Sequence, residues 1–155
     1  MSVSLTGGDT ITIGARGGAP RILVDLADGD TGVLDFPNNL VEAKVGKNGN
    51  TIYAYNSMGA TGTLTIRVLR GSADDKFLNS EMNRYKLDPS AYTLLDGEVI
   101  KRIGDGLGNI SNDVYIMSGG IIQKMPAAKE NVEGDIEQAI TTWQIIFANA
   151  DRGLT

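Results

Sequence analysis

Two residue types, cysteine and histidine, are absent from this sequence of 155 residues. The absence of cysteine excludes disulfide bonds, thiolate nucleophiles, thiolate zinc sites and cysteine-ligated iron–sulfur clusters. The absence of histidine excludes nucleophiles activated by an imidazole and histidine-ligated metals. It also removes the side chain that most often transfers protons near neutral pH. Only carboxylate, lysine or tyrosine chemistry is left, so we predict a protein that is not an enzyme and binds no cofactor or metal.

Long apolar runs and an excess of positive charge are also missing. The sequence has no run of about 18 apolar residues, the minimum for a transmembrane helix. Its N-terminal segment MSVSLTGGDT has neither a positive nor an apolar region, so we expect no secretory signal and no membrane anchor. The 19 acidic residues outnumber 14 dispersed basic ones, for a net charge of −5. Tight binding to nucleic acid or to an anionic membrane is therefore not expected.

Glycine, by contrast, is abundant, and it occurs at short intervals. The 20 glycines form no long linker and are placed as turns between strands are. With 41% hydrophobic and 21% charged residues, the composition is typical of a folded globular protein. The length predicts one domain covering residues 1–155.

Alternation of apolar and polar residues predicts a mostly β fold. The clearest strand is 62–69, and the face expected to enter the core carries Leu64, Ile66 and Val68. The opposite face carries Thr63, Thr65 and Arg67. Other strands are expected at 9–13, 21–26, 31–36, 114–125 and 135–147, the last followed by a polar tail at about 148–155. A bulge or turn is expected at Asp96–Gly97, and a bulge or close backbone approach at Gly119–Gly120.

One helix is expected, at about residues 73–85. Ser72 is a suitable N-cap, and Asp74 and Asp75 in the first turn interact favourably with the helix dipole. One face of this helix carries Phe77, Leu78, Met82 and Tyr85. The Asp88–Pro89 pair is expected to end it.

A hairpin is expected at about residues 40–55. Its arms alternate around an Asn48–Gly49 pair, which suits a tight turn. The tip is polar and we count few large apolar residues in the arms, so we expect the hairpin to project from the domain rather than fill its core.

Several polar clusters have simpler interpretations than a site. Asp25, Asp28 and Asp30 suit a turn better than a calcium site, because their spacing is not that of an EF-hand. The glycine-rich segment 104–109 lacks the spacing and the Lys-Ser/Thr pair of a phosphate loop. Trp143 lies on an apolar strand face, which favours a core position over a sugar-binding platform.

Two stretches and the order of the elements resemble the tail tube proteins of contractile-tailed bacteriophages. The stretches are GTLTIRVLRGSADDKFL at 62–78 and AITTWQIIFA at 139–148. The resemblance implies an antiparallel β-sandwich or half-barrel with one flanking α-helix. It also implies that six copies close into a ring and that rings stack into the inner tail tube, which conducts DNA during ejection.

The resemblance carries further expectations about partners and place. The partners would be other copies of the chain and the tail sheath and baseplate proteins, with DNA passing through the lumen without specific binding. The protein would be made in the cytoplasm of the host bacterium and reside in the tail of the virion. An acidic wall suits this role, because it repels DNA phosphate.

Two sets of residues are assigned to assembly on these grounds. The hairpin tip is expected to contact the next ring through Lys47, Asn48 and Asn50. The polar face of strand 62–69 is expected to face the lumen or a neighbouring subunit through Thr63, Thr65 and Arg67, with Arg67 paired to a carboxylate.

Three alternatives stay open at this point. The first is the tube protein of a contractile injection system, which shares the fold. The second is a monomeric β-sandwich that binds carbohydrate or calcium, with Asp25, Asp28 and Asp30 as ligands. The third is an enzyme that uses a pair of carboxylates, as glycosidases do.

Overall fold

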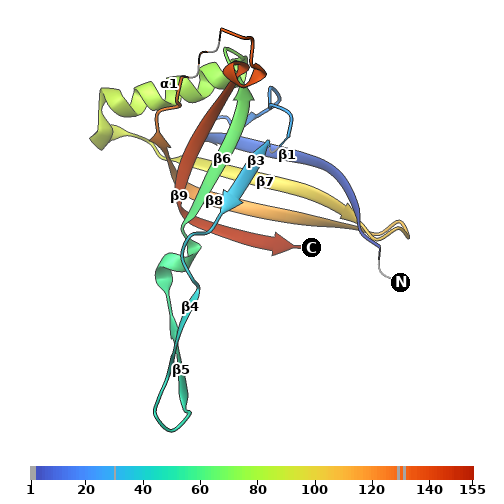
Figure 1. The fold of residues 1–155 in the computed structure, drawn as a ribbon, viewed down its shortest axis with the longest axis vertical. Coiled ribbons are helices and arrows are strands. Elements are labelled where there is room, and N and C mark those ends of the chain that lie inside the picture. The colour runs from blue at the N-terminus through green and yellow to red at the C-terminus, as the bar shows by residue number, and fades with distance from the viewer. Residues whose placement is uncertain (1–2, 30, 129, 131) are drawn as a thin grey trace.

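The computed structural model describes residues 3–29, 31–128, 130 and 132–155. The fold is mostly β, as predicted: an open antiparallel sheet of seven strands, a separate two-stranded hairpin and one flanking α-helix (Figure 1). The strands are β1 (Leu5–Ala15), β2 (Arg21–Ile22), β3 (Gly32–Asp35), β4 (Val41–Val45), β5 (Thr51–Tyr55), β6 (Gly62–Leu69), β7 (Leu95–Gly104), β8 (Ile110–Lys124) and β9 (Ile140–Leu154). The helices are α1 (Ala73–Leu87) and the short 3₁₀ turns η1 (Ser57–Ala60), η2 (Pro89–Ala91) and η3 (Ile136–Ala139).

The large sheet has the strand order β2-β1-β7-β8-β9-β6-β3. Strand β9 joins its two halves, because Ile140–Phe147 pairs with β6 while Gln144–Leu154 pairs with β8. In Figure 1, β9 runs beside β6 and then turns to run along β8. The sheet thereby curls into a half-barrel.

Two predicted irregularities are present where the sheet curves. The pairing of β7 with β8 shifts between Leu95 and Gly97, which is the bulge expected at this position. Gly119 has a positive φ of 69°, and a Cβ placed on Gly120 would lie 2.4 Å from Cε1 of Phe147. The prediction of a close backbone approach at this glycine pair is therefore confirmed.

The core lies on the inner face of the curled sheet. The predicted apolar face of β6 is buried, and Leu64, Ile66 and Val68 are each at most 1% exposed. The facing residues of β9 are also buried: Trp143, Ile145 and Phe147. The prediction that Trp143 is a core residue is confirmed, and its indole N–H donates to Asp75 at 2.9 Å.

Helix α1 begins at the predicted residue and covers one end of the core. The Ser72 hydroxyl caps it by accepting from the Asp75 N–H at 3.3 Å. Leu78 and Met82 are buried against the sheet, as the predicted apolar face requires. The helix ends at Leu87, two residues later than expected, and Asp88 follows in an extended conformation.

The strand predicted at 21–26 is wrong in length, because β2 contains only Arg21 and Ile22. The carboxylate of Asp74 accepts from the backbone N–H groups of Val24 and Asp25, both at 2.7 Å, and from Nε of Arg21 at 2.8 Å. These N–H groups are thus bonded to a side chain rather than to a strand. Asp74 is fully buried, so its role exceeds the dipole interaction that the sequence suggested.

Both predicted ends of the long strand 135–147 are wrong. Its first residues form η3, where the Asp135 carboxylate accepts from the Glu137 N–H at 3.1 Å. Its far end extends to Leu154, because β8 continues to offer a partner as far as Asp113. Most of the segment expected as a tail at 148–155 is therefore sheet.

Candidate assembly surfaces

The hairpin of β4 and β5 projects from the domain, as Figure 1 shows, and its two strands pair only with each other. Its base is fixed by short contacts. The Asn56 N–H donates to the Leu40 carbonyl at 2.9 Å, and the Asn38 side chain donates to the Met58 carbonyl at 3.2 Å. The hairpin is therefore held in place at its base although its strands pair with no strand of the other sheet.

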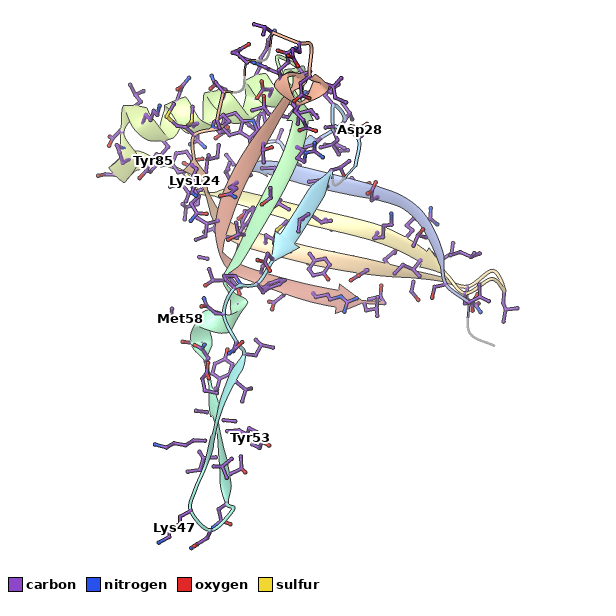
Figure 2. The ribbon with its side chains drawn as sticks, in the orientation of Figure 1. Asp28, Lys47, Tyr53, Met58, Tyr85 and Lys124 are labelled. Carbon is purple, nitrogen blue, oxygen red and sulfur yellow. The ribbon has the colours of Figure 1, made fainter. Side chains whose placement is uncertain are left out.

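The predicted stacking residues lie at the far end of this hairpin. Lys47, Asn48 and Asn50 are all exposed, and Figure 2 shows Lys47 at the tip. The turn is closed by a hydrogen bond of 2.7 Å from the Gly46 N–H to the Asn50 carbonyl. The side chains at the tip are available for contact.

The arms of the hairpin are less polar than we expected. The register pairs Val41 with Tyr55, so alternate residues of both strands share one side. We call this side the hairpin face; it consists of Val41, Ala43, Val45, Thr51, Tyr53 and Tyr55. The other side carries Glu42, Lys44, Ile52 and Ala54. Every residue of both strands is exposed, with Tyr53 at 73% and Tyr55 at 79%.

A groove lies next to the base of the hairpin. We call it the base groove; its lining includes Phe36, Leu40, Gly59, Ala60, Tyr115 and Ala150, with Asp151 and Arg152 at its polar edge. The Phe36 and Tyr115 rings lie 6.3 Å apart, and the Arg152 guanidinium lies 5.7 Å from the Tyr115 ring centre. The groove therefore combines apolar and aromatic walls with charged groups.

Arg152 is fixed at this edge by a two-point ion pair. Its Nε and one terminal nitrogen donate to the two Asp113 carboxylate oxygens at 2.8 and 2.9 Å. Hydrogen bonding to Arg152 holds the pKa of the Asp113 carboxyl below its ordinary value. The pair therefore keeps its charges at neutral pH and positions the guanidinium beside Tyr115.

The outer face of β6 has the second set of predicted residues. Thr63, Thr65 and Arg67 are half-buried and point away from the core. Arg67 donates to the Asp28 carbonyl at 3.1 Å and forms an ion pair with Glu137 at 3.4 Å. Arg67 thus has a carboxylate partner in its own chain, as the lumen assignment required.

The acidic clusters occupy turns and caps. Asp25 and Asp28 lie in the segment between β2 and β3, and Asp30 lies outside the described residues. Among the residues described, no group of three or more acidic side chains is arranged to hold a metal ion. The segment 105–109 forms the turn between β7 and β8, in which Asp105 accepts from the Leu107 and Asn109 N–H groups.

The hairpin face and the base groove were not found from the sequence. A signal for the first existed, because a turn at Asn48–Gly49 sets Val41 opposite Tyr55 and puts both tyrosines on one side. The groove had no such signal, since its walls come from four separate parts of the chain. No helix in the part of the chain that the structure describes is long and apolar enough to span a membrane.

Comparisons with known proteins give a match in fold only. No protein-family model and no curated protein matches the sequence. Among solved structures, the chain is similar to one in the cryo-EM structure of the anti-feeding prophage baseplate, which was 6-fold symmetrised. The TM-score is 0.55 at 9% sequence identity, and the match covers 94% of this chain and 91% of the other. Nearly the whole chain therefore shares its fold with a chain of that baseplate.

Proposed function

We propose that the protein is a structural subunit of a contractile tail or a contractile injection particle. The observation that carries this proposal is the shared fold with a chain of a baseplate, over almost the full length of both chains. The exposed projecting hairpin supports it, because apolar side chains left in water on a monomer are typical of interaction surfaces. The protein acts through assembly rather than catalysis.

Within such a particle, we propose that six copies form a ring and that rings stack into the inner tube. The 6-fold symmetrised structure that contains the similar chain supports this ring size. The open edges of the sheet, β2 and β3, are short and are covered when neighbouring subunits pair. The other partners are then sheath and baseplate proteins, and the location is the tail of the particle.

The polar face of β6 is proposed to line the channel or a subunit boundary. The Arg67–Glu137 ion pair supports this, because it compensates the positive charge on that face. The chain has a net charge of −5. A channel wall of this kind would not displace the counterions of the DNA phosphates, so DNA could pass without binding to it. A structure of the assembled ring shows whether Thr63, Thr65 and Arg67 face the channel.

The test of the proposed function is the state of the purified full chain. Light scattering coupled to size exclusion, followed by negative-stain electron microscopy, is expected to show six-membered rings or stacked tubes. A monomer at every concentration, with or without calcium or oligosaccharides, would contradict the proposal and favour a ligand-binding module.

The hairpin tip provides a second arm of this test. Deletion of residues 47–50 is expected to leave the subunit folded, because these residues contact nothing in the core, but to shorten or prevent tubes. Tubes of normal length from this deletion would reject the assignment of Lys47, Asn48 and Asn50 to the stacking contact.

A further inference from the structure

The turn at the tip of the hairpin contains the only Asn-Gly pair in the sequence, Asn48–Gly49. We infer that Asn48 is a site of spontaneous deamidation, at which the side-chain amide becomes the carboxylate of an aspartate or an isoaspartate without an enzyme. The reaction consumes only water, and it takes place on the single subunit. The inference therefore goes beyond the proposed function and does not depend on it.

The chemistry is a ring closure followed by a hydrolysis. The backbone nitrogen of Gly49, after losing its proton to base, attacks the side-chain carbonyl carbon of Asn48. The new carbon–nitrogen bond closes a succinimide ring, the bond to the side-chain nitrogen breaks, and that nitrogen leaves as ammonia. Water then opens the ring at either carbonyl, which gives aspartate or isoaspartate. Glycine favours the attack, because it has no Cβ to crowd its nitrogen.

The structure leaves the side chain of Asn48 free to react. Asn48 and Gly49 are both exposed, and nothing lies within 4 Å of a Cβ built on Gly49. Among the residues that the structure describes, the Asn48 side chain makes no hydrogen bond. The Asn56 side chain, by contrast, accepts from the Met58 N–H at 3.1 Å and is held by this bond.

One contact at the tip opposes the reaction. The Gly49 N–H donates to the Gly46 carbonyl at 3.0 Å, and this hydrogen bond must open before the nitrogen can attack. Opening costs little here, because β4 and β5 pair only with each other and all their residues are exposed. A two-stranded hairpin without a packed face is at best marginally stable in water. The tip therefore opens by itself, while the seven-stranded sheet stays folded.

Two other exposed asparagines show why the reaction is confined to Asn48. Asn50 lies in the same turn, but it precedes Thr51, whose β-branched side chain crowds the attacking nitrogen. Asn79 precedes a small residue, Ser80, but both lie inside α1, where the backbone N–H groups are held in the helix. Only Asn48 combines an uncrowded nitrogen with a backbone that opens readily.

The product changes the tip in two ways. Deamidation adds a negative charge next to Lys47. The isoaspartate form also lengthens the main chain by one methylene group, in a turn that is closed by the 2.7 Å hydrogen bond from the Gly46 N–H to the Asn50 carbonyl. Because the turn sets the register of a hairpin, we expect the isoaspartate form to loosen the pairing of β4 with β5.

The experiment compares the same dipeptide in two environments. The unmodified full chain and a Ser80→Gly variant, which places glycine after Asn79 in the helix, are incubated at mildly alkaline pH, once folded and once in urea. The chains are kept dilute so that subunits stay separate, and circular dichroism shows that the variant is folded. Peptide mass spectrometry then follows the conversion of each asparagine, and an isoaspartyl methyltransferase labels the isoaspartate.

We expect Asn48 to convert in the folded chain, faster at higher pH, while Asn50 stays unmodified over the same time. The rate at Asn48 should be at most about tenfold lower than in urea, which corresponds to an opening free energy of about 1.4 kcal/mol. In the Ser80→Gly variant, Asn79 should convert as fast as Asn48 in urea but should be strongly protected in the folded chain.

Three results would overturn the inference. If Asn48 is protected in the folded chain as strongly as Asn79 of the Ser80→Gly variant, the hairpin tip does not open as inferred. If Asn50 converts as fast as Asn48, the Asn-Gly pair does not define the site. If Asn48 is stable even in urea, the ring closure does not occur in this sequence. None of these results bears on the assembly of rings, so the proposed function is tested separately.

Discussion

The hairpin and the β6–β9 pair are both antiparallel ribbons with alternating side chains, yet their environments are opposite. In β6, buried residues alternate with half-buried ones, whereas every residue of β4 and β5 is exposed. In each case alternate positions form an apolar face. The comparison shows that alternation defines a face without saying whether the same chain covers it.

The largest effect on stability is expected in the β6–β9 ribbon. Trp143→Ala should lower the free energy of unfolding by about 4 kcal/mol, because it empties a large volume in the core and removes the donor to Asp75. Denaturant unfolding measures this change, with Tyr53→Ala in the hairpin as the control. An equal decrease in the free energy of unfolding for Trp143→Ala and Tyr53→Ala would contradict the difference in burial between the two ribbons.

The next effect is expected at Asp74, which joins the helix to the loop after β2. Asp74→Ala should cost about 3 kcal/mol, because the N–H groups of Val24 and Asp25 and the Arg21 side chain lose their buried acceptor. Asp28→Ala, at an exposed turn, is the matched control and should change little. Comparable unfolding curves for both variants would show that the buried carboxylate is not structural.

A smaller effect is expected where β8 approaches β9. Gly120→Ala should cost about 2 kcal/mol, because the new methyl group meets the buried Phe147 ring. Gly153→Ala meets no atom within 4 Å and should be nearly neutral. Chemical unfolding of the Gly120→Ala and Gly153→Ala variants measures both changes. The difference between them gives the cost of the close contact with Phe147, apart from the general effect of replacing a glycine.

The smallest effect on stability is expected in the hairpin. Tyr53→Thr should change the free energy of unfolding by less than about 0.5 kcal/mol, because the side chain is exposed and leaves no cavity. Its thermal midpoint should match that of the unmodified chain. A clear loss of stability would mean that the hairpin packs on its own domain and is not free for assembly.

Features decided by neighbouring residues could be predicted from the sequence. The alternation of β6 and the Ser72 cap of α1 are of this kind, and so is the irregularity at Asp96–Gly97. The mostly β class followed from such local patterns, and the half-barrel was implied by the resemblance to tail tube proteins.

Features decided at a distance could not be predicted. Strand β2 is short because a carboxylate about 50 positions away binds its continuation. Strand β9 extends to Leu154 because β8 provides a partner there. The base groove likewise requires four distant segments to meet, so the sequence predicted the position of the hairpin but not the groove beside its base.

The position of β9 has a consequence for synthesis of the protein. Although β9 is the last of the strands to leave the ribosome, it lies between β8 and β6 inside the sheet. Until it emerges, β8 and β6 each have an unpaired edge, and Trp143 and Phe147 are missing from the core. A nascent chain therefore cannot complete this sheet, or the core behind it, until synthesis has passed β9.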